Sequence, residues 1–163
     1  MKTLYLVRHA DALVSTDYPE EHDLYRPLTP KGMQQATQLG VYCASLEIQP
    51  DSIIVSPATR TIQTTQLIMA EIDYQSDFFV TDERLWDTPN VQDFLELLGE
   101  LPDDVDSVLL VGHNPSLLSF LQHINSSHTS FKKGEMIIIH RSTDTWENLT
   151  HPQIQGSFLP TSE

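Results

Sequence analysis

Blocks of hydrophobic residues alternate with blocks of mixed polarity along the chain, and this pattern predicts strands separated by helices. The apolar blocks are short and nearly continuous, which is typical of strands covered on both faces of a sheet. The predicted strands are residues 2–7, 52–55, 78–80, 107–111 and 135–140. Residues 145–149 are expected to pair with the last of these strands as a hairpin.

Between the predicted strands, apolar residues recur every three or four positions, as in helices with one buried face. The pairs Thr29-Pro30 and Ser56-Pro57 each place a capping residue before a proline. Both pairs are therefore expected to begin helices, with the first residue as N-cap. A third helix is expected after Thr88 or Asn90, and a short fourth helix after Pro115.

The order of these elements predicts an α/β protein with three α/β/α layers and a mainly parallel central sheet. We expect one domain over residues 1–163, because this length suits a single hydrophobic core and the chain shows no repeat, low-complexity tract or linker. Residues 151–163 contain proline, glycine and serine, and they are expected to form a loosely ordered tail.

Composition narrows the classes of partner. The formal net charge of −14 at pH 7 argues against nucleic acid, whose phosphates would be repelled. No apolar run reaches the roughly 18 residues of a membrane span, and the N-terminus lacks the layout of a signal peptide. The single cysteine, Cys43, excludes an internal disulfide. We therefore expect a cytoplasmic protein without membrane association, and a monomer, because the domain needs no partner to bury its core.

Cationic side chains and histidines stand where predicted strands end. Arg8 and His9 follow the first strand, Arg60 lies in the first turn of the helix after the second strand, and His113 follows the fourth. Because the carboxyl ends of parallel strands share one edge, where ligands bind in such sheets, we expect these four side chains to face one crevice.

The chemistry of these four residues favours phosphate. Guanidinium groups offer paired donors to phosphate oxygens, a helix N-terminus adds backbone N–H groups, and a neutral imidazole can act as a nucleophile. Two histidines without accompanying carboxylates or thiolates do not make a zinc site. The pattern therefore predicts a phosphate site that uses no metal and no cofactor.

Three segments resemble the signature of the histidine phosphatase superfamily, the phosphoglycerate-mutase-like proteins. They are residues 6–9 (Leu-Val-Arg-His), 56–64 (Ser-Pro-Ala-Thr-Arg-Thr-Ile-Gln-Thr) and 111–114 (Val-Gly-His-Asn). The small size and residues 26–32 (Arg-Pro-Leu-Thr-Pro-Lys-Gly) resemble the SixA-type phosphohistidine phosphatase branch. The resemblance implies a phosphoglycerate-mutase-like fold and a metal-independent phosphatase.

The resemblance also implies a role for each matching residue. His9 would be the nucleophile that becomes phosphorylated, and Arg8, Arg60 and His113 would bind the phosphoryl oxygens. His9 must be neutral to attack, and neighbouring cations should lower its pKa, whereas His113 is more useful as a protonated donor. The superfamily usually has glycine at the position of Ala10, and alanine occurs there in the SixA-type branch.

Three further residues are candidates with an alternative each. Asp87 takes the place of the glutamate that serves as general acid in larger members, although it could instead be a turn residue at a helix entry. Arg26 could contact substrate or form a salt bridge within its loop. Asn114 could contact substrate and orient His113, or it could cap the following helix.

Whether Asp87 can act as a general acid affects which substrate the site can hydrolyse. Imidazole is a better leaving group than an alkoxide, so a site without a firm acid suits phosphohistidine on a partner protein better than an alkyl phosphate. A small-molecule phosphomonoesterase acting on a phosphorylated metabolite is the alternative. A phosphate-recognition module without turnover is the alternative of another class, and the presence of all four residues argues against it.

Overall fold

A computed structural model of the chain describes residues 1–74, 78–125, 127–147 and 153–161. Among these residues the strands are β1 (Lys2–Arg8), β2 (Ser52–Val55), β3 (Val80–Thr81), β4 (Ser107–Gly112), β5 (Met136–Arg141) and β6 (Gln153–Phe158). The α-helices are α1 (Pro30–Ser45), α2 (Thr59–Glu71), α3 (Val91–Gly99) and α4 (Ser116–Ile124). Short 3-10 turns are η1 (Ser15–Asp17), η2 (Glu20–Tyr25) and η3 (Glu83–Leu85). None of the described helices is long and apolar enough to cross a membrane.

The strands form one sheet in the order β3-β2-β4-β1-β5-β6. The first four of these are parallel to one another, β5 pairs antiparallel with β1, and β6 pairs antiparallel with β5. Arg8 of β1 pairs with Gly112 of β4, and Val55 of β2 pairs with Val111, so three strands end together at one edge. The predicted α/β architecture is confirmed.

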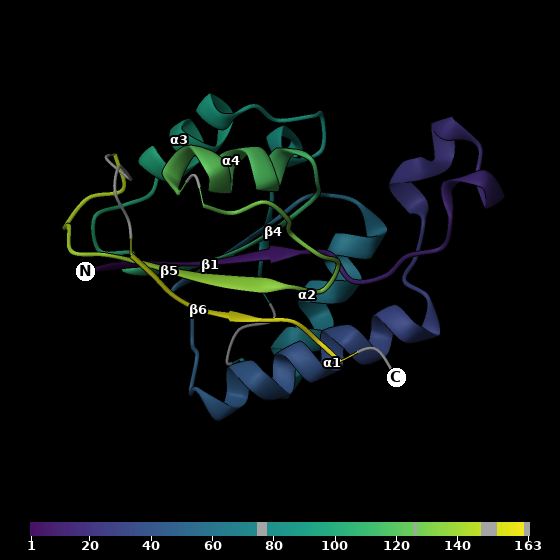
Figure 1. Cartoon of the computed structure of the whole chain (residues 1–163), viewed down its shortest axis with the longest axis horizontal. Helices are drawn as coiled ribbons and strands as arrows, with labels where there is room; N and C mark the ends of the chain where they lie inside the picture. Colours follow the sequence, from purple (N-terminus) through teal and green to yellow (C-terminus); the bar gives the residue numbers. More distant parts are fainter. Residues whose placement is uncertain (75–77, 126, 148–152, 162–163) are drawn as a thin grey trace.

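Helices cover both faces of the sheet, with α3 and α4 on one face and α1 and α2 on the other (Figure 1). Along β1, Leu4 and Leu6 belong to the core under α3 and α4, whereas Val7 belongs to the core that includes Leu39 of α1 and Ile68 of α2. Because β1 is buried from both sides, both faces of the strand are apolar, as the continuous run predicts.

The helix starts agree with the prediction in three places and differ in one, and α4 begins directly after Pro115 as expected. Thr29 caps α1 by accepting the Gly32 N–H, and Asn90, rather than Thr88, caps α3. The prediction for Ser56 is wrong, because α2 begins at Thr59 without a side-chain cap. The Ser56 hydroxyl instead lies 2.7 Å from a ring nitrogen of His113, a tertiary contact that local capping rules do not contain.

The last strand also differs from the prediction. β6 pairs antiparallel with β5 and lies within residues 151–163, which were expected to be a loose tail. The expected hairpin partner, residues 145–149, is not a strand over 145–147, and 148–149 lie outside the described residues. β6 covers the edge that β5 would otherwise expose, and Phe158 stacks on Tyr42 of α1 at 4.4 Å between ring centroids.

Candidate active site

His9 follows β1 directly and is held through its backbone N–H and through ring Nδ1. Its backbone N–H donates to the Gly112 carbonyl, and its side chain is 7% exposed. Ring Nδ1 lies 2.7 Å from the Ala10 carbonyl oxygen, which can only accept, so we assign the proton to Nδ1. Nε2 then keeps its lone pair, as a nucleophile requires.

The surroundings of His9 also keep it neutral. Burial, followed by the nearby charges of Arg60, Arg8 and Lys133, lowers the pKa of His9 to about 3, although its bond to the Ala10 carbonyl acts in the opposite direction. At neutral pH the ring therefore carries no charge. The expectation that neighbouring cations lower this pKa is confirmed, with desolvation as the larger cause.

Arg60 projects from the first turn of α2 and is 5% exposed. Its guanidinium lies 5.3 Å from the centre of the Trp86 ring. Two of its nitrogens donate to Asp23, one to the backbone carbonyl at 2.8 Å and one to carboxylate oxygen Oδ2 at 3.2 Å. A backbone and a side-chain acceptor of one residue thus fix the outer edge of the guanidinium.

His113 follows β4, and its ring centre lies 5.2 Å from that of His9 and 5.5 Å from that of Trp86. Nε2 shares a hydrogen bond with the Ser56 hydroxyl. Burial, and then the charges of His9, Arg60 and other arginines, lower the pKa of His113 to about 2. The ring is therefore neutral at pH 7 in this structure, and only an added anion would favour the protonated form expected from the sequence.

Three nitrogens around His9 are buried without a hydrogen-bond partner among the described residues. They are Nε of Arg8, Nε of Arg60 and Nδ1 of His113. Arg8 donates through a terminal nitrogen to the Phe131 carbonyl at 2.9 Å. A buried polar group without a partner costs about 1–3 kcal/mol, so this concentration is characteristic of a site that binds an oxygen-rich anion.

Asp23 is a site residue that the sequence did not suggest. It lies in η2, and its carboxylate accepts from Arg26 at 2.6 Å as well as from Arg60. A terminal nitrogen of Arg26 also donates to the Leu13 carbonyl. Arg26 thus forms the loop salt bridge that was its alternative, and substrate contact by Arg26 stays a prediction. An acidic residue three positions before an arginine was the available signal for Asp23, and it is a weak one.

Asn114 does not cap a helix, and the carboxylate of Asp87 forms no hydrogen bond with the other described residues of the site. α4 has no side-chain cap, so the capping prediction for Asn114 is wrong. Its amide donates at 2.8 Å to the Phe131 carbonyl, the same acceptor that Arg8 uses. Asp87 is exposed after η3, and its neighbour Trp86 contacts His113 and Arg60 instead. A general-acid role for Asp87 and an orienting or substrate-binding role for Asn114 stay predictions.

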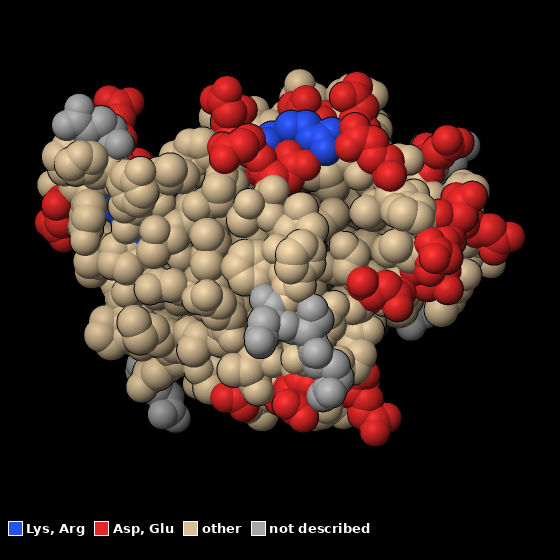
Figure 2. Space-filling view, turned by 180° about the vertical axis from the view of Figure 1, so that it is seen from behind, with Lys and Arg blue, Asp and Glu red and all other residues tan. Residues whose placement is uncertain are grey.

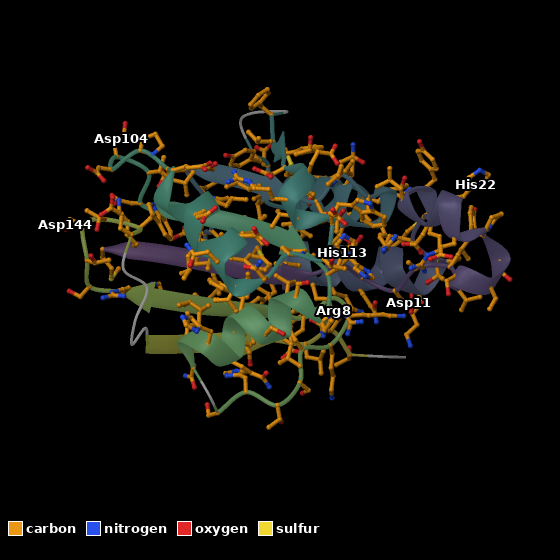
Figure 3. All side chains as sticks on the ribbon, turned by 90° about the horizontal axis from the view of Figure 1, so that it is seen from above. Arg8, Asp11, His22, Asp104, His113 and Asp144 are labelled. Atoms are coloured by element: carbon orange, nitrogen blue, oxygen red, sulfur yellow. The ribbon has the colours of Figure 1, made fainter. Side chains whose placement is uncertain are left out.

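Backbone contacts tie the loop after His9 to α1 and α2. The Ala10 N–H donates to the Thr64 hydroxyl at 3.1 Å, and this hydroxyl donates to the Arg60 carbonyl. A Cβ on Gly32 would lie 1.9 Å from the Asp11 carbonyl oxygen, so this turn of α1 needs glycine. Figure 3 shows Arg8, Asp11 and His113 toward one end of the sheet, with Asp104 and Asp144 at the other.

No group of three or more His, Cys, Asp or Glu side chains within the described ranges is arranged to hold a metal ion. The charged groups that act on His9 are Arg60, Arg8 and Lys133, and Asp23 is the acidic neighbour of Arg60. Such a set can bind and polarise a phosphoryl group and can offer a nucleophilic nitrogen.

The chain matches the family model of the histidine phosphatase superfamily (branch 1) over residues 4–87. This match covers more than half of the chain, and the chain therefore belongs to this superfamily. The matched residues include Arg8, His9 and Arg60, whereas His113 lies beyond them. Membership confirms the predicted enzyme class, a phosphatase.

Two curated relatives are the mitochondrial serine/threonine-protein phosphatases Pgam5 of Drosophila persimilis and Drosophila pseudoobscura pseudoobscura. Each is 35% identical over 72 residues, which is 44% of this chain and 24% of the relative. The matched segment thus spans about a quarter of the length of these relatives.

Solved structures share the fold over nearly the whole chain. The putative phosphohistidine phosphatases SixA of Nakamurella multipartitia and Agrobacterium tumefaciens give TM-scores of 0.78 and 0.80 at 24% and 23% identity. The alignments cover 99% and 98% of this chain and 97% and 99% of those chains. The protein histidine phosphatase SixA complexed with tungstate gives 0.81 at 18% identity, with 96% of each chain covered. The fold is therefore that of SixA-like proteins.

Proposed function

We propose that this protein is a metal-independent phosphohistidine phosphatase in which His9 carries the phosphoryl group between two half-reactions. The observation that supports this most directly is the state of His9: a buried, neutral ring with Nδ1 tied to the Ala10 carbonyl and Nε2 free to attack. Family membership and the SixA-like fold support the same reaction.

In the first half-reaction, Nε2 of His9 attacks phosphorus and a new N–P bond forms. The P–N bond to the substrate histidine breaks, its electron pair stays on the leaving imidazole, and that imidazole takes a proton from solvent. The His9 ring becomes positively charged, and the Ala10 carbonyl stabilises this charge through Nδ1–H. The unpartnered Nε–H groups of Arg8 and Arg60 would bind the phosphoryl oxygens.

In the second half-reaction, water attacks phosphorus and the bond to His9 breaks. Its electron pair returns to Nε2, the attacking water releases a proton to solvent, and inorganic phosphate leaves with the oxygen of the water. The sum is hydrolysis of phosphohistidine to histidine and phosphate, with the enzyme regenerated. His113 is neutral before binding, and a phosphate dianion beside it would raise its pKa and so favour its protonated form.

The leaving group decides between the candidate substrates. Asp23 is bound to two arginines, and Asp87 is exposed without a hydrogen bond of its carboxylate to the described residues, so neither is set up as a proton donor. This favours imidazole over the serine or threonine alkoxide that the name of the curated relatives suggests. A phosphorylated metabolite with an alkoxide leaving group is disfavoured for the same reason.

Trapping tests the proposal. We expect phosphohistidine peptide carrying labelled phosphate to leave acid-labile label on His9, and His9→Ala to lose both label and turnover. His123→Ala, at an exposed position of α4, is the matched control and should keep both. Turnover that survives His9→Ala would contradict the mechanism. A chelator should leave the rate unchanged, and faster hydrolysis of a phosphoserine peptide than of a phosphohistidine peptide would contradict the substrate class.

A further inference from the structure

Two lysines stand out among the cations of this acidic chain. The sequence has nine Lys and Arg residues against 23 Asp and Glu. Most of these cations are neutralised, since Lys2, Arg26, Arg60, Arg84 and Lys133 each form an ion pair with a carboxylate. Lys31 and Lys132 are exposed, and within the described ranges no carboxylate or other acceptor binds their ammonium groups. With so many acids available, this is a local excess of positive charge.

Both lysines lie beside the backbone that carries His9. Lys132 is two residues before Gly134, whose N–H lies 3.1 Å from the carbonyl oxygens of both Arg8 and His9. Lys31 precedes Gly32, which packs directly on the Asp11 carbonyl. Lys31 contributes to lowering the pKa of Asp11, which agrees with this proximity. The excess charge therefore lies next to the backbone segment around His9 and Asp11.

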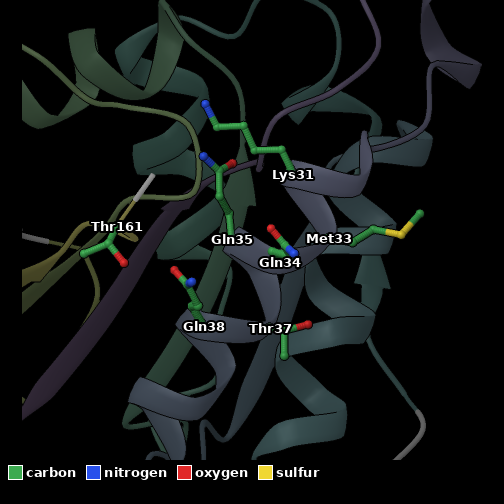
Figure 4. Close-up of a pocket in the computed structure, with 7 residues that line it drawn as sticks. All are labelled: Lys31, Met33, Gln34, Gln35, Thr37, Gln38 and Thr161. Carbon is green, nitrogen blue, oxygen red and sulfur yellow. The ribbon is translucent and has the colours of Figure 1, made fainter. Parts of the chain in front are cut away.

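A surface pocket adjoins Lys31. Its volume is about 370 Å³, and it is lined by Thr161 and by residues of α1, namely Lys31, Met33, Gln34, Gln35, Thr37 and Gln38. Figure 4 shows Thr161 across from the glutamine side chains, with Lys31 at the upper end. Gln35 connects the pocket to the loop after His9, because its side-chain oxygen accepts the Asp11 N–H at 2.9 Å.

The lining of this pocket matches a polypeptide. Side-chain amides and a hydroxyl can each donate and accept, so they can bind the main chain of a peptide whatever its sequence. The face of the molecule seen from behind shows acidic side chains around its rim, and the large basic patch visible there is flanked by acidic side chains (Figure 2). Near the loop after His9, in contrast, Lys31, Lys132 and Lys133 outnumber the neighbouring carboxylates of Asp11 and Glu135.

We propose that Lys31, Lys132 and the adjoining pocket bind an acidic segment that flanks the phosphohistidine of the substrate protein. This rests on the proposed function and adds the kind of partner. A short acidic segment interacts with charges within about 8–10 Å, the screening length at physiological salt, and here the lysines outnumber the carboxylates of Asp11 and Glu135. A nucleic acid or an anionic membrane would extend over the rest of a surface with net charge −14 and be repelled.

Three phosphohistidine peptides of equal length test the proposal, with glutamate, glutamine or lysine on both sides of the phosphorylated residue. At low salt we expect kcat/KM to be highest for the glutamate peptide and lowest for the lysine peptide, over a range of about tenfold or more. The order should flatten at about 1 M salt, where the screening length is about 3 Å. Equal values for the three peptides at low salt would overturn the proposal.

The variant Lys31→Gln/Lys132→Gln should remove most of the preference by raising KM for the glutamate peptide. Its turnover of phosphoramidate, a small P–N substrate, should match that of the wild type. The matched control is Gln66→Glu/Gln122→Glu, which makes the same change in net charge at exposed positions of α2 and α4. An equal loss in the control would show that net charge alone acts and would overturn the proposal.

The proposed function and the docking surface can fail separately. A wild-type protein that does not hydrolyse phosphoramidate or any of the peptides would contradict the proposed function. Binding of the unphosphorylated glutamate peptide, followed by fluorescence anisotropy, needs no catalysis. Binding that weakens in Lys31→Gln/Lys132→Gln and not in the control would still support the surface, and the absence of binding together with equal peptide rates would overturn it.

Discussion

Each end of β1 carries a cation with a buried nitrogen atom, and the two cations differ in their hydrogen-bond partners. At the amino end, Lys2 is 1% exposed, and its ammonium group donates to the carbonyls of Asp103 at 2.6 Å and Val105 at 2.9 Å and to the Asp106 carboxylate at 3.1 Å. An ammonium group has three N–H bonds, so Lys2 is fully satisfied. The network ties β1 to the turn before β4.

At the carboxyl end of the same strand, the Arg8 side chain donates to the Phe131 carbonyl, and its buried Nε has no partner among the residues that the structure describes. Arg60 and His113 add two more such nitrogens nearby. Burial of a cation therefore does not by itself indicate function. The difference between the two ends is whether the protein itself supplies the acceptors, and at the carboxyl end a ligand must supply them.

The largest expected effect that separates the two ends is on catalysis. Arg60→Ala should lower kcat on phosphoramidate by about 10²–10³-fold, the usual loss when one preorganised donor to a transition-state oxyanion is removed. Arg60→Lys should recover only part of it, because an ammonium group lacks the paired donors of guanidinium. Steady-state kinetics measure both, and a fall of less than about threefold in Arg60→Ala would contradict the role.

At the amino end the corresponding change should affect stability alone. Lys2→Met should lower the free energy of unfolding by about 2–3 kcal/mol, because it leaves carbonyl acceptors of a charged donor without their partner. Its kcat and KM on phosphoramidate should equal those of the wild type. Urea unfolding followed by circular dichroism measures the free energy of unfolding. A loss of activity in the folded variant would contradict the purely structural role of Lys2.

The pH dependence of stability should report the burial of His9. Its pKa is about 3 in the folded protein and about 6.5 in an unfolded chain, so below pH 6.5 the unfolded chain binds a proton that folded His9 does not. Stability must therefore fall as the pH drops, by about 2 kcal/mol for this residue at pH 5. Between pH 7 and pH 5, the free energy of unfolding of His9→Asn should fall by about 2 kcal/mol less than that of the wild type. Urea unfolding at the two pH values measures this difference.

The matched control for this measurement is His123→Asn, at an exposed position of α4. It should follow the pH dependence of the wild type. If His9→Asn and the wild type changed stability equally between pH 7 and pH 5, the buried and neutral state assigned to His9 would be wrong.

The smallest expected effect concerns Asp23, whose carboxylate offsets part of the positive charge of Arg26 and Arg60. Asp23→Asn keeps an acceptor for the arginines and removes a negative charge beside Arg26 and Arg60. The inhibition constant of inorganic phosphate should fall by about three- to tenfold, because a like charge near the bound anion is removed. Asp17→Asn, at an exposed position of η1, is the control. Weaker inhibition in Asp23→Asn would show that the residue serves to position Arg60.

Much of the site could be predicted because topology alone brings its residues together. Apolar runs mark strands, and the alternation of strands and helices makes the sheet parallel, so residues just after β1, β2 and β4 must share an edge. Arg8, His9, Arg60 and His113 stand at those positions in the sequence. The distance of 5.2 Å between the two imidazole rings is the consequence.

Local rules failed where a distant group competed with them. Ser56 has the residue type and the following proline of a helix cap, yet its hydroxyl lies against His113. Asn114 likewise turns to the Phe131 carbonyl and leaves α4 without a side-chain cap. β6 is weak in strand-forming residues and is placed by the open edge of β5.

The sequence by itself determined the order of elements, the sheet edge and the residue types that meet there, because these follow from periodicity and chain topology. Only the tertiary structure decided which buried donors have acceptors, that Asp23 lies between two arginines, and that Lys31 and Lys132 have no acidic partner among the described residues. Hydrogen-bond satisfaction depends on atoms that meet from distant segments. No local pattern contains it.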